Sequence, residues 1–277
     1  MHRIHKKAFT LIELLVVISI IALLLSILMP GLQKAKAVAH SVLCKSNLKQ
    51  YQFATMMYFS ENNDKLFVFD KTVAINTQPF ELAELYIDNV NEIRFCSAIK
   101  APSSSDISNA EKPANLNVNF ANRSSSPSPM GDPTGWMQGS NKRPWLLNGE
   151  YASYTFNGNL YTGEEATGFK SASQIKSSGL VPAYGDGVWP DAWPHHESGI
   201  DHPETILEWG RVTFGANDTI QRYITNRHGF KTNMVYFDGH VDTIKLIDLW
   251  RQRWGPPFKP LNDDDLRGLE NIDVIMQ

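Results

Sequence analysis

The sequence predicts an α+β protein. A long N-terminal helix, transmembrane in its first half and amphipathic in its second, is expected to pack on a C-terminal antiparallel β-sheet head with a long irregular insertion. Three observations indicate this fold class: an apolar run fills residues 9–29, a helical period of apolar residues continues to residue 62, and an Asp-Gly pair separates two apolar runs near the C-terminus. The chain has 277 residues, so enough sequence follows the helix for one sizeable head.

The apolar run has the length of a membrane-spanning helix. At 1.5 Å per residue, a helix over residues 9–29 crosses the roughly 30 Å apolar core of a bilayer. Glu13 carries the one formal charge in this run. A carboxylate in such a helix costs about 2.5 to 3.5 kcal/mol on insertion scales, so we expect Glu13 to have a positively charged partner. Arg3, Lys6 and Lys7 precede the run and favour a cytoplasmic N-terminus.

The junction from Lys7 to Glu13, Lys-Ala-Phe-Thr-Leu-Ile-Glu, resembles the N-terminus of type IV pilins and type II secretion pseudopilins. In that family a prepilin peptidase cuts a short basic leader before a phenylalanine, and glutamate is the fifth residue of the mature chain. The resemblance implies a leader over residues 1–8, cleavage between Ala8 and Phe9, methylation of the Phe9 amine, and Glu13 in the glutamate position. The family usually has glycine before the cut, where this chain has Ala8.

Two other interpretations of the N-terminus stay open. A cleaved signal peptide also has a basic start and an apolar core, and Ala-Lys-Ala at residues 35–37 imitates its cleavage site. An unprocessed single-pass anchor is the second alternative. Signal-peptide cores are usually about 7 to 15 residues long and carry no acid, so the pilin-like interpretation alone accounts for Glu13.

An amphipathic helical spine is predicted over residues 30–62. Apolar residues recur there at intervals of three and four, with lysines and a glutamine between them. The period stops at residues 62–64, where we expect the helix to end. The membrane span and the spine together predict a rod of about 50 residues, roughly 75 to 80 Å long. The rest of the chain, residues 63–277, is expected to form the exported globular head.

Short elements are expected in the head, separated by an insertion. Residues 101–145 are rich in Ser, Pro, Asn and Gly, which predicts a long loop-rich insertion on the surface. A short helix is expected over residues 80–86. Residues 66–69 follow the rod, and a second ordered block is expected to begin at residues 151–156. Strands are expected at residues 93–96, 180–184 and 205–209.

The chain has two cysteines, Cys44 and Cys96. They are too few for a disulfide-dense scaffold, and they lack the spacing of a zinc site. An exported head in an oxidising compartment favours a disulfide between them, while the alternative is two separately buried thiols. On the chain-entropy model, the bridge would stabilise the head by roughly 4 kcal/mol.

The C-terminal segment, residues 228–244, predicts a β-hairpin with Asp238 and Gly239 in its turn. An Asp-Gly pair between apolar runs is a strong signal for a type I′ turn, in which both central residues have positive φ. Nine residues separate His228 from Asp238, and this spacing resembles the H-X9-DG domain of prepilin-like proteins. Two further segments fit the same families: Cys44 with residues 47–50, and residues 153–158.

Some polar residues are candidate metal ligands. His228 has three acidic or histidine neighbours in the sequence: Asp238, His240 and Asp242. On the two-residue period of a strand these three share one face, which permits a metal site. The structural interpretation, in which His228 hydrogen-bonds a loop and Asp238 lies in the turn, is preferred, so no metal or cofactor is predicted. A second cluster lies in a loop rich in proline and tryptophan: His195, His196, Glu197 and His202.

Tryptophans raise the alternative of carbohydrate binding. Flat aromatic rings stack on sugars, but tryptophan is more often a core or interface residue. The residues concerned are Trp189, Trp193, Trp209, Trp250 and Trp254. The sequence patterns of serine hydrolases, zinc peptidases and phosphate-binding loops are absent, so an enzyme is not predicted.

These observations predict a structural subunit, pseudopilin-like or minor-pilin-like, of a type II secretion or type IV pilus-like assembly. The resemblance implies a single-pass inner-membrane protein with a periplasmic head that enters a pseudopilus or pilus after processing. Its implied partners are a prepilin peptidase, other pilin-like subunits through the N-terminal helix, and the inner membrane. A net charge of −3 without basic clusters argues against nucleic-acid binding. The alternative is a membrane-anchored envelope or polysaccharide-binding protein, and a metal-dependent hydrolase is the third.

Overall fold

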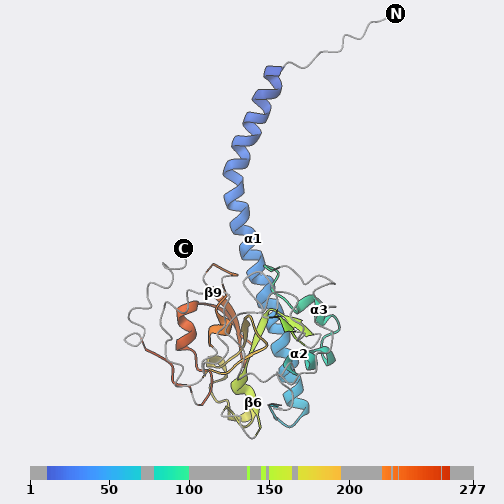
Figure 1. Ribbon diagram of the computed structural model, residues 1–277, viewed down its shortest axis with the longest axis vertical. Coiled ribbons are helices and arrows are strands. Elements are labelled where there is room, and N and C mark those ends of the chain that lie inside the picture. The colour runs from blue at the N-terminus through green and yellow to red at the C-terminus, as the bar shows by residue number, and fades with distance from the viewer. Residues whose placement is uncertain are drawn as a thin grey trace, which may run out of the picture. The chain divides into compact units, whose positions relative to one another are not determined.

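The computed structural model confirms the α+β class, with a long N-terminal helix followed by a β-sheet region (Figure 1). Two compact units make up the chain, Met1–His40 and Ser41–Gln277, and each is described by itself. The structure describes residues 11–69, 78–99, 136–137, 145–147, 150–163, 168–194, 220–225, 227–229, 231–256 and 258–262. Helix α1, Leu11–Glu61, begins in the first unit and ends in the second.

The described part of the first unit is the beginning of α1, and its surface is apolar. Large apolar side chains from Leu11 to Met29 are exposed. The most apolar stretch of α1 has a mean hydropathy of 3.0, so its length and composition suffice to cross a membrane. The hydroxyl groups of Ser19 and Ser26 donate to carbonyl oxygens within the helix, which suits polar groups in apolar surroundings. The helix continues through Pro30.

In the second unit, α1 presents one buried face to the head. Buried positions recur at three- and four-residue intervals, as an amphipathic helix requires. They are Cys44, Leu48, Tyr51, Gln52, Ala54, Thr55 and Phe59. Val42 lies off this face and is 60% exposed.

The helix ends where the sequence predicted. Asn63 and Asp64 both have positive φ, 57° and 59°, and the amide of Asp64 donates to the carbonyl of Phe59 at 2.8 Å. A hydrogen bond between residues five apart, with a left-handed asparagine before the donor, is the 6→1 bond of a Schellman C-cap. It satisfies a terminal carbonyl and turns the chain back toward the head.

The main sheet has five strands in the order β10-β9-β7-β5-β8. Neighbouring strands are antiparallel, as the sequence predicted, except for β5 and β8, which run parallel. The strands are β5 (Tyr154–Asn157), β7 (Pro182–Asp186), β8 (Asp191–Ala192), β9 (Lys231–Tyr236) and β10 (Val241–Lys245).

Two smaller sheets and several short helices complete the described part of the head. β1 (Phe67–Val68) pairs in parallel with β6 (Tyr161–Thr162), and β3 lies between β2 and β4. The other strands are β2 (Trp136–Met137), β3 (Trp145–Leu147) and β4 (Glu150–Ala152). The short helices are α2 (Gln78–Glu81), η1 (Leu82–Leu85), α3 (Val90–Ile93), η3 (Gly158–Leu160), η4 (Ala172–Gln174), η5 (Ser178–Leu180), η6 (Ile220–Tyr223) and η7 (Leu246–Arg251).

One sequence prediction for the head is corrected. The strand expected at residues 93–96 is wrong, because Val90 and Ile93 are both buried at a helical spacing of three in α3. The insertion at residues 101–145 contains strand β2 and the start of β3, while its other residues lie outside the described part. The strand expected at residues 205–209 also lies outside it.

Aromatic rings form the core between α1 and the sheet in the second unit. The ring centroid of Tyr51 in α1 lies 5.4 Å from that of Phe80 in α2 and 5.7 Å from that of Tyr184 in β7. Tyr184 in turn lies 4.9 Å from Phe156 in β5. Each such pair adds about 0.5 to 1.5 kcal/mol beyond the burial of its area, so the end of α1 is an integral part of the head.

Candidate functional site

The structure joins Cys44 and Cys96 in a disulfide. Cys44 lies on the buried face of α1, and Cys96 lies in the loop after α3. Their Cα atoms are 4.8 Å apart, within the range that a disulfide spans. Both residues are fully buried.

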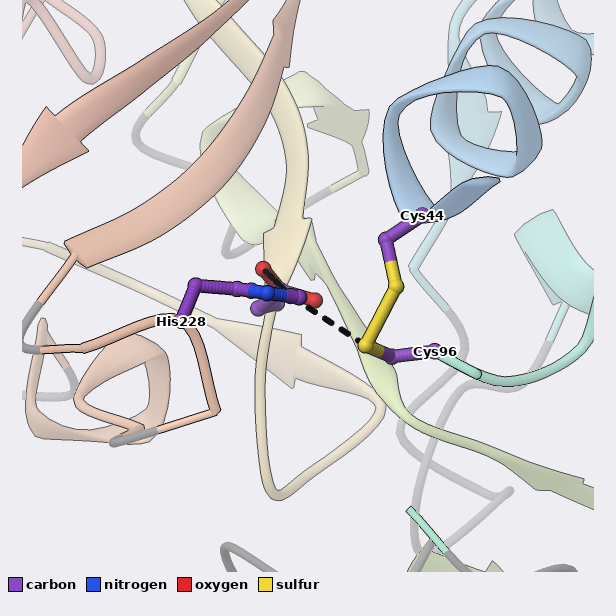
Figure 2. A group of neighbouring side chains, drawn as sticks. Cys44, Cys96 and His228 are labelled. Atoms are coloured by element: carbon purple, nitrogen blue, oxygen red, sulfur yellow. Dashed lines mark hydrogen bonds and ion pairs between the residues drawn. A yellow bond between two sulfur atoms is a disulfide. The ribbon is translucent and has the colours of Figure 1, made fainter. Parts of the chain in front are cut away.

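His228 lies against this bridge, in the turn before β9 (Figure 2). Its Nε2 atom is 3.2 Å from Cys96 Sγ and 3.3 Å from Asp186 Oδ2. The His228 side chain is 3% exposed and that of Asp186 is fully buried. The histidine of the H-X9-DG spacing is therefore part of a buried cluster with the cysteine pair and a carboxylate.

Asp186, at the end of β7, is only partly satisfied by hydrogen bonds. Its Oδ2 accepts a bond from the amide of Asn233 at 2.9 Å. Its Oδ1 is buried and has no hydrogen-bond partner within the part of the chain that the structure describes. The guanidinium of Arg227 supplies positive charge nearby: burial lowers the pKa of Arg227, and the negative charge of Asp186 opposes that change.

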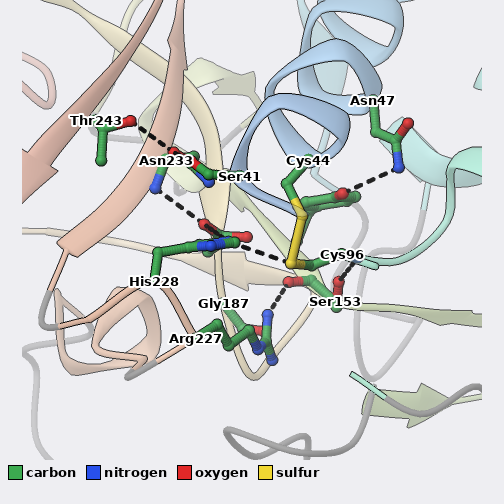
Figure 3. Close-up of polar contacts among 12 residues, drawn as sticks. Ser41, Cys44, Asn47, Cys96, Ser153, Gly187, Arg227, His228, Asn233 and Thr243 are labelled. Atoms are coloured by element: carbon green, nitrogen blue, oxygen red, sulfur yellow. Dashed lines mark hydrogen bonds and ion pairs between the residues drawn. A yellow bond between two sulfur atoms is a disulfide. The ribbon is translucent and has the colours of Figure 1, made fainter. Parts of the chain in front are cut away.

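Hydrogen bonds around Ser153 fix the segments that carry the cluster (Figure 3). The Ser153 hydroxyl accepts a bond from the amide of Cys96 at 2.6 Å, and its carbonyl accepts bonds from Arg227 and from the amide of Gly187. Arg227 also donates to the Gly187 carbonyl. A Cβ atom at Gly187 would lie 1.6 Å from Thr155 Oγ1, so only glycine fits beside Asp186.

Asn233 connects the cluster to both α1 and the hairpin. Its Oδ1 accepts hydrogen bonds from the hydroxyls of Ser41 at 3.1 Å and Thr243 at 2.7 Å. Its main-chain amide donates a hydrogen bond to Asp186 Oδ2. Helix, sheet and hairpin therefore meet at one buried polar residue (Figure 3).

The hairpin at Asp238 and Gly239 is present between β9 and β10, but its turn is not type I′. The amide of Gly239 donates to the Tyr236 carbonyl at 2.8 Å, and Gly239 has φ +89°. Asp238 is absent from the described residues with positive φ. The loop therefore has the three-residue form, in which a turn is followed by a left-handed glycine.

Asp238 and His240 pair with each other at the surface. Asp238 Oδ1 accepts bonds from the His240 amide at 3.0 Å and from His240 Nδ1 at 2.7 Å. The His240 ring stacks on Tyr236 with centroids 4.2 Å apart. Burial raises the pKa of Asp238, but the hydrogen bonds and charge of His240 outweigh it, so that the pKa lies below its usual value.

The candidate metal ligands of the C-terminal segment do not all come together. His228 lies with Asp186 and Cys96, Asp238 pairs with His240, and Asp242 accepts a bond from the amide of Thr243. Among the described residues, the group of ligand atoms close to one another is Cys44, Cys96, Asp186 and His228. Sequence reasoning missed Asp186, which carries no local pattern. The cluster of His195, His196, Glu197 and His202 lies outside the described residues.

The tryptophans whose side chains the structure describes lie in the core or pack against it. Trp189, Trp250 and Trp254 are buried, each less than 5% exposed. Trp193 is half-buried and stacks on Tyr161, with ring centroids 5.3 Å apart. Trp209 lies outside the described part of the chain. These rings stabilise the core, as tryptophan more often does.

At the N-terminus, Glu13 lies in the first turn of α1 with an exposed side chain. An acid in the first turn is favoured by the helix dipole. Ala8 and Phe9, the residues of the expected cleavage site, lie outside the described residues.

The start of the chain matches a known family model. Residues 3–29 match the family model described as the prokaryotic N-terminal methylation motif. This match supports a pilin-like protein that is processed by a prepilin peptidase and assembles with other pilin subunits. No curated protein and no solved structure matched the chain.

Proposed function

We propose, from this motif, that the chain is a pseudopilin- or minor-pilin-like structural subunit of a type II secretion or type IV pilus-like assembly. One observation carries the proposal. Helix α1 has an exposed apolar beginning that contains a single acid, and after Ser41 one face of the helix, from Cys44 to Phe59, is buried in the core of the head. Such a helix offers a membrane or a helical partner one apolar surface, while the head stays folded and exported.

Processing changes the charge at the start of this helix. Cleavage between Ala8 and Phe9 removes Arg3, Lys6 and Lys7 and exposes a new positive amine on Phe9. Methylation of that amine preserves its charge. The mature subunit then begins its apolar segment with one cation at Phe9 and one anion at Glu13.

In the assembly, Glu13 of one subunit neutralises the Phe9 amine of a neighbour. Two unit charges 4 Å apart attract by about 1 kcal/mol in water and about 4 kcal/mol at an effective dielectric constant of 20. An isolated carboxylate in the helix costs about 2.5 to 3.5 kcal/mol on insertion scales, so pairing offsets a penalty that each separate subunit bears. The pairing also fixes the axial register, because it is satisfied at one offset between neighbouring helices.

Mass spectrometry of the mature N-terminus tests the proposal. The expected result is a chain that begins at Phe9 and carries one added methyl group on its amine. Ala8→Gly, which introduces the residue that the resembled family usually has before the cut, is the matched variant and should give the same start. Retention of Met1, or a start near Val38 from signal-peptide cleavage, would contradict the proposal.

A further inference from the structure

Four side chains with metal-binding atoms converge in the head from four separate segments. They are Cys44 on α1, Cys96 after α3, Asp186 at the end of β7 and His228 before β9. One ligand atom from each residue lies within 4.8 Å of all the others. Figure 2 shows the His228 ring directed toward the sulfur of Cys96.

The arrangement is not that of a proton relay. In a relay, the carboxylate holds one ring nitrogen of the histidine and the nucleophile contacts the other. Here Nε2 of His228 makes both contacts, 3.2 Å to Cys96 Sγ and 3.3 Å to Asp186 Oδ2. Nδ1 is buried and has no hydrogen-bond partner among the described residues. The nitrogen, sulfur and oxygen atoms are therefore neighbours of one another, as ligand atoms around a shared ion are.

The two contacts of His228 are close to the separations of ligand atoms in a tetrahedral zinc site. With zinc–nitrogen and zinc–oxygen bonds of about 2.0 to 2.2 Å and zinc–sulfur bonds of about 2.3 Å, neighbouring ligand atoms lie roughly 3.3 to 3.8 Å apart. The Nε2–Oδ2 separation of 3.3 Å lies at the edge of this range, and the Nε2–Sγ separation of 3.2 Å lies just below it. Asp186 also has a buried oxygen that no described donor satisfies, which a bound cation would stabilise.

We propose that Cys44, Cys96, Asp186 and His228 form a site for a divalent transition metal, best matched to zinc, when the Cys44–Cys96 disulfide is reduced. Thiolate and imidazole ligands favour zinc over calcium or magnesium. The disulfide and the metal exclude each other, because thiolates bind the ion and a disulfide has none. Cys44 of α1 thus has two alternative cross-links: a covalent one to Cys96 in the loop after α3, and one through the ion that also includes Asp186 at the end of β7 and His228.

The charges of the site balance with the help of Arg227. Two thiolates and one carboxylate carry three negative charges, and zinc supplies two positive ones. The half-buried Arg227, whose guanidinium interacts electrostatically with Asp186, supplies the third. Arg227 also donates to the carbonyls of Ser153 and Gly187, so its position is fixed by the backbone.

The conversion between the two cross-links is a balanced exchange. A dithiol reductant gives two electrons and two protons to the bridge; its own thiols become a disulfide, and Cys44 and Cys96 become thiols. Zinc binding then releases the two thiol protons to solvent. The Asp186 carboxylate and the neutral His228 ring complete the four ligands.

Cobalt, a spectroscopic substitute for zinc, tests the site in the full-length chain purified in detergent. The bridge is first reduced with a phosphine under anaerobic conditions, and thiols are counted. Titration with Co²⁺ should give about one ion per chain, with thiolate-to-cobalt charge-transfer absorption and the visible bands of a tetrahedral complex. Zn²⁺ should displace the cobalt, and the unreduced chain should show neither band.

Variants separate the four-ligand site from binding by cysteines alone. His228→Gln and Asp186→Asn keep the approximate shape of each side chain and should weaken Co²⁺ binding at least about 10-fold, since loss of even an outer partner costs about 10- to 100-fold. Cys44→Ser with Cys96→Ser should abolish the charge-transfer band. His240→Ala, which removes an exposed histidine paired with Asp238, is the matched control and should bind as the unaltered chain does.

Three results would overturn the proposal. The first is a reduced, folded chain without thiolate–cobalt absorption. The second is unchanged affinity in both His228→Gln and Asp186→Asn. The third is a head that loses its tryptophan fluorescence and circular dichroism spectrum on reduction, because the site would then not exist in folded protein. None of these measurements requires processing or assembly, so the site and the proposed subunit function fail independently.

Discussion

The side-chain amide of Gln52 donates a hydrogen bond of 2.7 Å to the main-chain carbonyl of Phe237. Both residues are buried, so this bond links α1 to the β9–β10 turn inside the core. The amide of Phe237 donates to the carbonyl of Val181 at 2.8 Å. The backbone of the turn is thus fixed on both sides, by the helix and by the segment before β7.

Replacing Gln52 with methionine should destabilise the head by about 1 to 3 kcal/mol. Methionine has a similar shape but leaves the buried Phe237 carbonyl without its donor, and an unsatisfied buried group costs about that much. Chemical denaturation followed by tryptophan fluorescence measures the change. Gln50→Met is the control, because the hydrogen bond that Gln50 donates among the described residues goes to Ser46 within α1, and its loss should cost less than about 0.5 kcal/mol. Equal effects of the two variants would show that the bond to Phe237 contributes nothing.

Gly239→Val should destabilise the head by about 1 to 3 kcal/mol through the backbone alone. Gly239 has φ +89°, and a Cβ atom there would meet no atom within 4 Å. Gly239→Asn is the matched variant, since asparagine tolerates positive φ better than β-branched residues do. We therefore expect Asn to cost clearly less than Val in thermal unfolding. If both cost the same, steric contact rather than φ determines the residue at this position.

Removing the bridge with Cys44→Ser and Cys96→Ser should lower the free energy of unfolding. The cysteines are separated by 52 residues, for which the chain-entropy model gives about 4 kcal/mol. Thiol alkylation without reductant should find no free thiol in the unaltered chain extracted from the envelope. Two alkylatable thiols in that native preparation would show that the pair is reduced there.

Glu13→Val should insert into the membrane but fail to assemble. The substitution makes the helix more apolar, so insertion is preserved, while the partner of the Phe9 amine is lost. Incorporation into cross-linked assemblies should fall by an order of magnitude or more, because about 2.5 to 3.5 kcal/mol depends on the pairing and 1.4 kcal/mol is a factor of ten. Ser19→Val, which alters a residue that bonds within its own helix, is the control. Normal incorporation of Glu13→Val would end the argument for charge pairing.

Asp238 should make the head less stable in acid. Its folded-state pKa lies below its usual value, with His240 as the cause that prevails over burial. The ionised carboxylate therefore stabilises the native state above its unfolded-state pKa of about 3.9, and this contribution is lost as pH falls through the folded-state pKa. Asp238→Asn should show a smaller loss of stability between about pH 5 and pH 2 in acid denaturation curves. A curve identical to that of the unaltered chain would contradict the role of the pair.

Local patterns predicted much of the fold. The helical period gave α1 and its end near Asn62, and the Asp-Gly pair gave the β9–β10 hairpin. The structure differs from the sequence predictions where the determining contacts are non-local. Whether residues 93–96 form a strand depends on Ile93 packing into the core, and the parallel pairing of β5 with β8 depends on which strands meet in the folded chain.

The buried cluster shows the same limit. His228 stood out through its spacing to Asp238, but the structure pairs it with Asp186 instead. Asp186 ends a strand in which every residue is buried, and nothing near it in the sequence distinguishes a buried carboxylate from a turn residue. The predicted type I′ turn was wrong for a different reason. An Asp-Gly pair suits both a two-residue loop and a three-residue loop, and the register of the two strands decides between them.

The bridge between Cys44 and Cys96 also determines how the chain transmits mechanical tension. A pull applied between the beginning of α1 and any residue after Cys96 passes through the sulfur–sulfur bond, which bypasses the segment between the two cysteines. That segment contains the end of α1, α2 and α3. The cysteines are separated by 52 residues. At about 3.3 to 3.6 Å per extended residue, the bridge prevents roughly 170 to 190 Å of chain from extending under tension. A stretched subunit keeps this length folded until the bridge opens, so the redox state of two cysteines sets how far one molecule can extend.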